Sequence, residues 1–598
     1  MPSDIRRTDD HDWRLDKIGV VGPGIVGMPM AALLARASLR GVLATRPRVV
    51  VVQRASPTSG WKVDAINAGR SPIGGVEPDL DAVVAETVAA GLLSATHDMT
   101  AIADADAILI CTQTDRAGLG PDYGPLFAAV GELARAIRAT PRARAPVIVF
   151  ESTLAPSSMH TVVREEFARH GLIEGRDVLL GNSPNRVMPG RLVHRVMTSD
   201  KLVAGLTPAT PRRIARLYGT IVTEGTLHQT NSLTAEIVKT LENAYRDVRI
   251  AYAAEVVRFC DERDIDFYEV RRQCNEQLGQ TDRASADPGA VPTGALLIPT
   301  IGVGGHCLPK DGILLSWRRL ERDAGASRSL FLESRRINDD APAESIRLAE
   351  RTFGRIAGRR VALMGTAYRF DSEDTRNSPT LTLARLLLAK GCHVTLHDPY
   401  VRPGDQNLLR TGLDPHFTQD VGAAVEGAEY LFFCTAHRTY LDEWDSIRRQ
   451  ARSARGVFDG CNLLSRQSVG TDLRYAGIGR GTHAPEAGLV DAVLRGFRIV
   501  ELRVANELAE LIEFLNAEYA ADDFNRADFR EVQRLAATCG TGCAIVDPRP
   551  LDERDALASV EAILPSRLIS QARHAQAPQV AQAPPVVQAP QVWNEARV

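Results

Sequence analysis

The stretch Lys17-Ile-Gly-Val-Val-Gly-Pro-Gly-Ile-Val-Gly27 places the pattern GxGxxG directly after a short apolar run, and the apolar segment 28–37 follows it. A buried strand, a tight turn and a helix in this order bind a dinucleotide, because the helix N-terminus turns its positive dipole toward the phosphates. Gly22 permits the turn, Gly24 lets the backbone approach a pyrophosphate, and Gly27 allows helix and strand to lie close. The stretch therefore predicts a Rossmann-like domain that binds a dinucleotide.

The second apolar run, residues 48–52, bears on the choice of dinucleotide. In this fold an acidic residue after the second strand accepts hydrogen bonds from the adenosine ribose. This chain has Gln53 and then Arg54, and a guanidinium suits a phosphate better than a hydroxyl. We therefore expect NAD as the cofactor and keep NADP as an open alternative.

Later apolar runs extend the α/β pattern. Residues 107–111 and 147–150 are short apolar runs that end in small polar residues, and helical patterns separate them. Such alternation predicts a parallel sheet with its ligand at the carboxyl edge, where the hydroxyls of Thr114 and Thr153 would lie. A second α/β unit begins at Val361 without GxGxxG, so it should bind something other than a dinucleotide.

A long helical pattern runs from residue 232 to about 263, between the two α/β units. Its polar residues form a stripe at steps of three and four, separate from the apolar stripe: Glu236, Lys239, Asn243 and Asp247. A polar stripe is usually a solvated face. A long helix that joins two domains is covered on several sides, however, and the stripe would then line an interface or a site.

The segment GVGGHCLPKD, residues 302–311, crowds glycines before His306 and Cys307. If a helix begins here, Cys307 and Asp311 lie four residues apart on one face. A cysteine at a loop-to-helix junction tends to have a lowered pKa, and the thiolate is the reactive form. From this segment alone, a nucleophilic cysteine and a buried structural cysteine beside a tight turn are equally good interpretations.

Composition and charge are those of an ordinary soluble protein. Of the 598 residues 44% are apolar and 24% charged, and the formal net charge of −3 gives no reason to expect a nucleic-acid partner. No apolar run is long enough to cross a membrane. The nine cysteines are mostly isolated, as in reduced cytoplasmic proteins, and we interpret the pair in CGTGC (539–543) as structural rather than metal-binding. We thus expect a cytoplasmic protein with no membrane association and no bound metal.

These motifs in combination resemble those of the UDP-glucose/GDP-mannose dehydrogenase family over roughly residues 16–484. The resemblance rests on the glycine-rich turn, INAG (66–69), EST (151–153), AEIVKTLENAYRDV (235–248), GVGGHC with Asp311, GTAYR (365–369) with DTRNSP (374–379), and HDPY (397–400). The segment SPNRVMPGR (183–191) favours the branch that acts on UDP-N-acetylhexosamines.

The resemblance implies a four-electron oxidation of the C6 primary alcohol of a UDP-sugar to a carboxylate, with NAD reduced twice. Cys307 would attack the C6 aldehyde to form a thiohemiacetal, which is oxidised to a thioester and hydrolysed by water. Lys239 and Asn243 would hold the oxyanion. Asp311 would handle protons near the sulfur, and Thr114 would position a water or a substrate oxygen. The central helix would form the core of a homodimer.

Two sets of binding residues follow from the glycine-rich turn and the resemblance. The cofactor set is Gly22, Gly24, Ile25, Val26, Gly27, Gln53, Arg54, Lys62, Thr114, Thr153 and Arg376. The substrate set, for a UDP-sugar, is Asn185, Arg186, Val187, Lys239, Asn243, Gly304, Gly305, Tyr368 and Arg369.

Three departures from the family pattern leave alternatives open: Gln53 replaces the ribose-binding acid, Asn185 replaces a glutamate that handles the hydrolytic water, and Arg369 replaces a lysine. An amide is no general base, so thioester hydrolysis would be slow unless a neighbour such as Glu151 helps. One alternative is a two-electron or NADP-using dehydrogenase that releases the aldehyde. Another, of a different class, is a catalytically silent scaffold that binds nucleotide sugars.

The whole pattern predicts an α/β fold: two Rossmann-like doubly wound domains joined by a long central helix, then a helical extension and a tail. In the extension, VANELAELIEFLNAEYA and FNRADFREVQRLAATC predict two amphipathic helices that would suit a protein partner. The expected segments are a flexible leader (1–15), the NAD-binding domain (16–205), a central dimerisation domain with the cysteine loop (206–335), the UDP-sugar-binding domain (336–484), the extension (485–570) and a disordered Ala/Pro/Gln/Val-rich tail (571–598).

Overall fold

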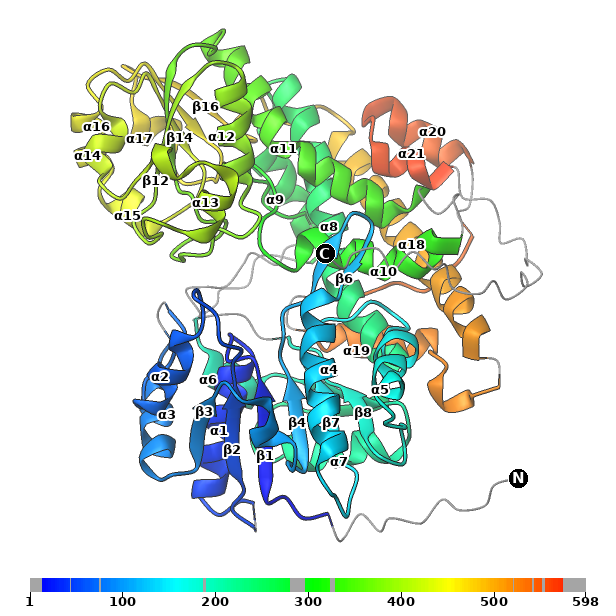
Figure 1. Cartoon of the computed structure of the whole chain (residues 1–598). Coiled ribbons are helices and arrows are strands. Elements are labelled where there is room, and N and C mark those ends of the chain that lie inside the picture. Colours follow the sequence, from blue (N-terminus) through cyan, green and yellow to red (C-terminus); the bar gives the residue numbers. More distant parts are fainter. Residues whose placement is uncertain are drawn as a thin grey trace.

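The computed structural model describes residues 13–43, 45–74, 77–186, 190–279, 296–322, 328–519, 521–539, 542–550 and 554–573. Two α/β domains lie at opposite ends of the molecule with long helices between them. Figure 1 shows the N-terminal domain in blue and cyan and the second domain in yellow-green. The last helices, in orange and red, lie against the central helices. This arrangement confirms the predicted fold class.

The N-terminal domain is built on one sheet of strand order β10-β9-β8-β7-β4-β1-β2-β3. Its strands are β1 (Lys17–Val21), β2 (Arg48–Val52), β3 (Leu93–Thr96), β4 (Ala107–Ile110), β7 (Val147–Phe150), β8 (Leu179–Asn182), β9 (Lys201–Gly205) and β10 (Leu227–Asn231). Neighbouring strands are parallel except β8 and β9, which pair antiparallel. A small ribbon of β5 (Asp115–Ala117) and β6 (Gly120–Asp122) follows β4.

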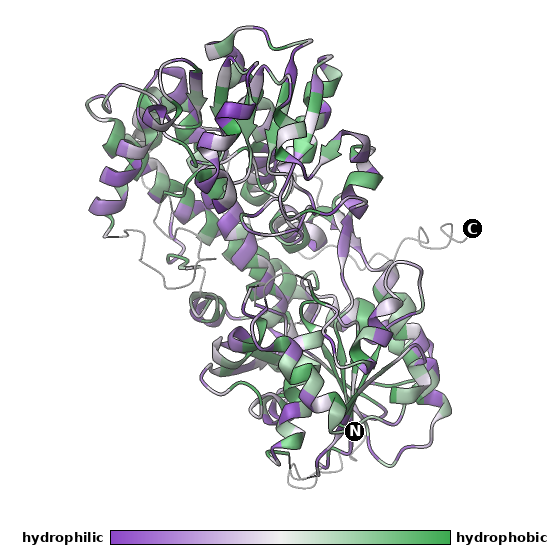
Figure 2. Ribbon diagram, turned by 90° about the vertical axis from the view of Figure 1, so that its left-hand side faces the viewer, coloured by the Kyte–Doolittle hydropathy of each residue, from purple (hydrophilic) through white to green (hydrophobic). Residues whose placement is uncertain are grey.

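Alternate residues of each strand enter two separate cores, one on each face of the sheet. Val149 packs in the core with α1 and α7, whereas Ile148 and Phe150 pack in the core with α4 and α5. The strands therefore read as unbroken apolar runs, because both faces are buried; they are green in Figure 2. The helices of this domain are α1 (Gly27–Leu39), α2 (Trp61–Asn67), α3 (Leu80–Ala89), α4 (Gly124–Ala139), α5 (Arg164–Arg169), α6 (Leu192–Thr198) and α7 (Ala209–Tyr218).

The second domain repeats this architecture with a parallel sheet of order β13-β12-β11-β14-β15-β16. Its strands are β11 (Arg360–Met364), β12 (His393–His397), β13 (Phe417–Thr418), β14 (Tyr430–Phe433), β15 (Gly456–Asp459) and β16 (Arg474–Gly477). Its helices are α12 (Pro379–Ala389), α13 (Gln406–Thr411), α14 (Val421–Val425), α15 (Arg438–Asp442), α16 (Trp444–Gln450) and α17 (Arg466–Val469). In each sheet the chain runs outward from the first strand to one edge and then returns to build the other side, so the strand order reverses beside β1 and β11. Ligands bind at the carboxyl edge of the strands beside such a switch point.

Between the two domains the described residues form α8 (Ser232–Glu262), α9 (Phe267–Gln277), α10 (Leu308–Arg322) and α11 (Leu330–Phe353). Asn231 caps α8 by accepting a hydrogen bond from the N–H of Thr234 at 2.8 Å. Helix α8 is the shared axis, since α10, α11 and α19 all pack along it. Most of its side chains are buried, including Glu236, Lys239 and Asp247 of the polar stripe, whereas Asn243 is half-buried.

The extension contributes α18 (Leu489–Asn516), α19 (Phe529–Ala537), α20 (Arg554–Ile563) and α21 (Arg567–Arg573). Its apolar side chains join those of α8 in one core; Val493, Val504 and Leu508 are among them. Tyr252 of α8 donates a hydrogen bond to the carbonyl of Val493 at 2.7 Å. The extension thus covers part of the α8 surface that a homodimer through this helix would use.

Several boundaries differ from the sequence-based expectation. Trp13 and Leu15, assigned to a flexible leader, are buried in the N-terminal core. Residues 571–573, assigned to the disordered tail, end α21. Helix α18 begins at Leu489, well before the predicted amphipathic segment, because its first turns pack on α9. Among the described helices, none is apolar over a stretch that would span a lipid bilayer.

Candidate active site

The glycine-rich turn between β1 and α1 has the geometry that a dinucleotide requires. Gly22 has a φ of +92°, which favours glycine, and its N–H bonds the carbonyl of Val52 at 2.9 Å. A Cβ on Gly27 would lie 2.2 Å from the Gly22 oxygen, whereas a Cβ on Gly24 would meet nothing within 4 Å. The turn is therefore tight toward the helix and open at Gly24, beside the half-buried Ile25 and Val26, where a pyrophosphate would approach.

The carboxyl end of β2 carries no carboxylate. The Gln53 amide donates to the Ser59 hydroxyl at 3.0 Å and stays half-buried, and Arg54 is exposed beside it. Lys62 lies on α2, and burial lowers its pKa. The edge that would hold a ribose thus offers an amide, a hydroxyl and two cationic side chains.

Thr114 and Thr153 meet at the carboxyl ends of β4 and β7. The buried Thr114 hydroxyl donates to the Thr153 carbonyl at 2.7 Å. A hydroxyl has one proton to donate, so Thr114 can only accept a further hydrogen bond. It can therefore receive a proton-bearing group, such as a water or a substrate hydroxyl.

Cys307 lies in the loop that leads directly into α10. Its carbonyl accepts the N–H groups of Lys310 at 3.1 Å and Asp311 at 2.9 Å, so the residue caps the first turn. Its side chain is exposed. The residue therefore lies at the N-terminal, positive end of the α10 dipole.

Asp311 joins α10 to α8 at full burial. It accepts a hydrogen bond from the Asn243 amide at 2.6 Å and pairs with Lys310 Nζ at 2.7 Å. The Lys310 side chain is 2% exposed. A buried carboxylate requires such partners, and its bond to the amide fixes the orientation of Asn243.

Lys239 lies one turn before Asn243 on α8 and is 7% exposed. Burial opposes its charge, but the Cys307 sulfur and the Asp311 carboxylate outweigh that effect and raise its pKa. Within the described residues its ammonium donates no hydrogen bond to the protein. A buried cation with protons left to donate can stabilise an oxyanion.

His306 precedes the cysteine and is held neutral. Burial, with the charges of Lys310 and Arg376 nearby, lowers its pKa to about 4. Its Nε2 is buried and has no hydrogen-bond partner among the described residues. A neutral imidazole can orient a ligand here without adding charge beside the sulfur.

We expect His306→Asn to reduce the loss of thermal stability at acid pH. Between about pH 6.5 and 4 the unfolded histidine binds a proton and the folded one does not, so native stability falls as the pH is lowered. The variant should lose roughly 2–4 °C less in Tm between pH 7 and pH 4.5 than the native protein. His393→Asn, at an exposed position, is the control; equal losses in all three proteins would contradict the assignment.

The cysteine loop docks on the loop that follows β11. A Cβ on Gly304 would lie 2.4 Å from the Tyr368 Cβ, and one on Gly305 would lie 2.9 Å from its ring. The Gly305 N–H bonds the Arg376 carbonyl at 2.8 Å. Both glycines are therefore required for this contact. Burial in it raises the pKa of the Tyr368 hydroxyl to about 12. Arg376, paired with Asp374 at 2.6 Å, lies close to Cys307.

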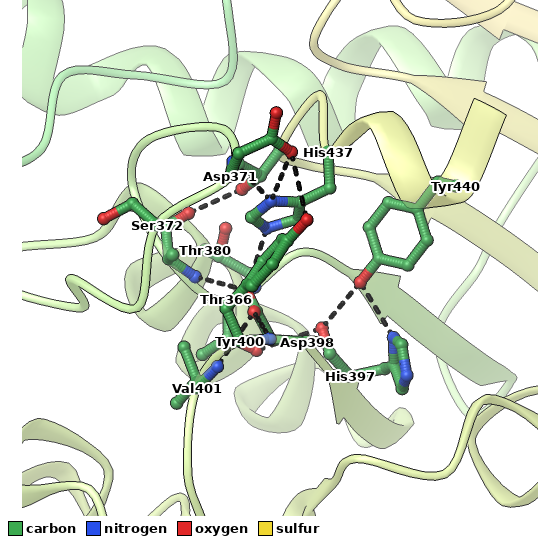
Figure 3. Close-up of polar contacts among 12 residues, drawn as sticks. Thr366, Asp371, Ser372, Thr380, His397, Asp398, Tyr400, Val401, His437 and Tyr440 are labelled. Carbon is green, nitrogen blue, oxygen red and sulfur yellow. Dashed lines mark hydrogen bonds and ion pairs between the residues drawn. The ribbon is translucent and has the colours of Figure 1, made fainter. Parts of the chain in front are cut away.

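A buried polar network holds that second loop in place (Figure 3). Asp398, at the end of β12, accepts the N–H groups of Thr366 and Ala367 and a hydrogen bond from His437 Nε2 at 3.0 Å. Burial opposes the Asp398 charge, but these donors hold its pKa below the usual value. His437 Nδ1 accepts the N–H of Asp371 at 2.9 Å, which orients the ring so that Nε2 faces Asp398.

Other predicted substrate residues lie on the N-terminal side of the site. Arg186 forms a buried ion pair with Glu242 of α8. The backbone N–H of Asn185 bonds the Glu151 carbonyl at 3.3 Å. Arg369 lies over the Phe370 ring, and Val187 lies outside the described residues. The structure thus brings Cys307, Lys239, Asn243 and Asp311 together. Arg369 belongs to the second domain, where it follows Tyr368 in the loop that contacts Gly304 and Gly305.

Glu151 does not face a ligand. Its side chain is fully buried, with Lys201 Nζ 2.7 Å from one oxygen and the Tyr218 hydroxyl bonded to the other. The expectation that it could assist thioester hydrolysis is wrong, because one oxygen is held by Lys201 and the other by Tyr218, both in the domain interior.

Sequence reasoning missed four contributors: Lys310, His437, and the extension residues Thr538 and Cys539. Lys310 directly precedes Asp311 in the sequence, so a pair between these opposite charges could have been considered. The histidine and the extension residues had no such signal, since their partners lie far away in the sequence.

Three family models match the chain, all of the UDP-glucose/GDP-mannose dehydrogenase family: the NAD binding domain over residues 16–222, the central domain over 233–340 and the UDP binding domain over 362–466. The UDP-N-acetyl-D-mannosamine dehydrogenase of Pyrococcus horikoshii is 30% identical over 470 residues, 78% of this chain and 99% of the relative. The solved structure of the UDP-D-ManNAc dehydrogenase from that organism aligns with a TM-score of 0.64 at 29% identity, over 78% of this chain and 99% of that one. The NDP-N-acetyl-D-galactosaminuronic acid dehydrogenase structure from Methanosarcina mazei Go1 aligns at 0.62 and 29%, over 78% and 96%.

Proposed function

The chain belongs to the UDP-glucose/GDP-mannose dehydrogenase family, which makes it a nucleotide-sugar oxidoreductase with an NAD-binding domain, and from that premise we propose that it oxidises the C6 alcohol of a UDP-N-acetylhexosamine to a carboxylate. The observation that carries the proposal is the buried Lys239 ammonium, which has no hydrogen-bond acceptor within the described residues and lies beside Cys307 and Asp311. The sugar class is taken from the relatives named above.

The residues divide the reaction between them. NAD, when bound, takes up the two electrons of each oxidation as hydride. Lys239 and the Asn243 amide donate to the C6 oxygen and stabilise its negative charge, which favours oxidation of the alkoxide to the aldehyde. The Cys307 sulfur then attacks the aldehyde carbon, and the new oxyanion rests on the same two donors.

The second oxidation converts the thiohemiacetal to a thioester, and water adds to its carbonyl to release the carboxylate and the thiol. Asp311 holds Asn243 and Lys310 in position through both oxidations. Thr114 accepts a hydrogen bond from a water or a substrate hydroxyl, since its own proton is committed to Thr153. The Asn185 backbone bonds Glu151, two residues before Thr153; its amide can orient a water but takes no proton from it.

The test is the number of nicotinamides reduced per sugar consumed, with UDP-N-acetylmannosamine, UDP-N-acetylgalactosamine and UDP-glucose in parallel. Two equivalents and a carboxylate product support the proposal. One equivalent with released aldehyde supports the second candidate, a two-electron dehydrogenase, which Asn185 favours because it cannot act as a base. No reduction with any sugar contradicts both.

We expect weak discrimination between NAD and NADP. The edge of β2 has an exposed Arg54 and a Gln53 amide where a carboxylate would repel a 2′-phosphate. Gln53→Asp should therefore lower kcat/KM for NADP relative to NAD by about tenfold or more, as one charge contact at a phosphate is worth. Arg54→Ala should lower kcat/KM for NADP and leave kcat/KM for NAD unchanged. Arg402→Ala, an 80% exposed arginine of the other domain, is the control; unchanged ratios in both test variants would refute the assignment.

A further inference from the structure

The extension reaches the N-terminal domain as well as the central helices. Glu518 accepts a hydrogen bond from the Ser157 hydroxyl at 2.9 Å, and Tyr519 bonds the same hydroxyl at 2.6 Å. The Asn525 amide donates to the carbonyl of Leu206 at 3.0 Å. Figure 1 shows this orange part of the chain running from α18 toward the N-terminal domain. The path leads α19 along α8, on the side of the predicted substrate residues.

The carboxyl end of α19 holds Arg186. One guanidinium nitrogen donates to the Thr538 hydroxyl at 2.8 Å and the other to the Leu535 carbonyl at 3.0 Å, while Glu242 supplies the counter-charge. The Arg186 side chain is 5% exposed and that of Glu242 3%. The Nε of Arg186 is buried too and has no acceptor among the described residues. The extension thus helps to determine where the Arg186 guanidinium lies, and the Nε–H of this arginine remains available as a donor.

Cys539 comes next and lies over one face of α8. Its half-buried side chain is hydrogen-bonded to Glu242 and lies near Lys239 and Arg246. These α8 residues are spaced by three and four positions, so they share a face. Lys239 lies near Cys307 at one end of that face, and Arg246 lies near Arg369 at the other. Residues that would hold the sugar and its nucleotide therefore lie on both sides of Cys539.

We propose that residues 535–539 of the extension form a wall of the sugar-nucleotide site, with Thr538 positioning Arg186 and Cys539 contacting the bound ligand between Lys239 and Arg369. The ligand is a nucleoside diphosphate sugar, whose anionic diphosphate suits the cationic face. The inference rests on the proposed function for the identity of that ligand. It means that the extension takes part in choosing the substrate.

The first test separates positioning from folding. Thr538→Val removes one acceptor from a buried guanidinium, so KM for UDP-N-acetylmannosamine should rise about tenfold or more while KM for NAD stays constant. Thr538→Ser should restore the native KM. Ser566→Ala removes another bond between the extension and α8, the one from Ser566 to Glu255, ~24 Å along the helix from Lys239, and should change neither KM.

The second test does not need turnover. In the Cys307→Ala variant, alkylation of Cys539 by iodoacetamide is followed by peptide mass spectrometry, alone and with UDP, UDP-N-acetylmannosamine or NAD. Either UDP ligand should slow the labelling at least fivefold, and NAD should not. Protection in a protein that oxidises no sugar would support this proposal and refute the proposed function. Labelling at the same rate with and without the UDP ligands, together with a native KM in Thr538→Val, overturns the proposal.

Discussion

Cys307→Ala should abolish carboxylate formation and lower the steady-state rate of nicotinamide reduction by about 10³-fold or more, as loss of a catalytic nucleophile does. The thiol is exposed at the start of α10 and supports no core, so the variant should fold normally. Without the sulfur there is no thiohemiacetal, and the second oxidation has no substrate. The measurement is reduced nicotinamide against time, with the sugar products separated by chromatography.

Cys392→Ala is the matched control, since that thiol is buried in the second domain and donates to the Ile356 carbonyl, away from the site. It should keep the native product. Carboxylate formed at a native rate by Cys307→Ala would remove the thioester route and leave hydrolysis through an aldehyde hydrate.

Lys239→Met should lower kcat by about 10²–10³-fold with little change in the affinity for UDP, because one donor to the developing oxyanion is lost. The methionine keeps the length of the buried stem, so the effect falls on the charge. Steady-state kinetics give kcat, and calorimetric titration with UDP gives the affinity.

Thr240→Val tests whether any change at this depth of α8 has the same result. Thr240 is the next residue, fully buried, and its hydroxyl donates to the helix carbonyls of Glu236 and Ile237. It should retain nearly native kcat. Equal losses in Thr240→Val and Lys239→Met would assign Lys239 a structural role.

The α/β core was readable from the chain because its signals are local. A glycine at Gly22 must take a positive φ, and Pro379 begins a helix at its first position, whatever lies elsewhere. Spacing on one helix also placed Lys239 and Asn243 on a common face. These inferences needed no partner from a distant part of the chain.

The contributions of the extension were not readable in this way. Its amphipathic pattern shows that α18 and α19 bury one face, but not against which surface. The bond from Arg186 to Thr538 joins residues 352 positions apart, and neither type of residue marks a site by itself. Glu151 shows the opposite error. Its position in a predicted ligand loop indicated a functional carboxylate, but in the fold it pairs with Lys201 and accepts a hydrogen bond from Tyr218.

The covering of α8 by the extension has a consequence for synthesis of the protein. Helix α8 ends at Glu262, while α21, which bonds Glu255 through Ser566 and Arg567, ends at Arg573, roughly 300 residues later. A ribosome adds about 5–20 residues per second, so the apolar side of α8 waits tens of seconds for its cover. The nascent chain therefore carries an open hydrophobic surface for about half of its elongation, and such a surface is what holdase chaperones bind.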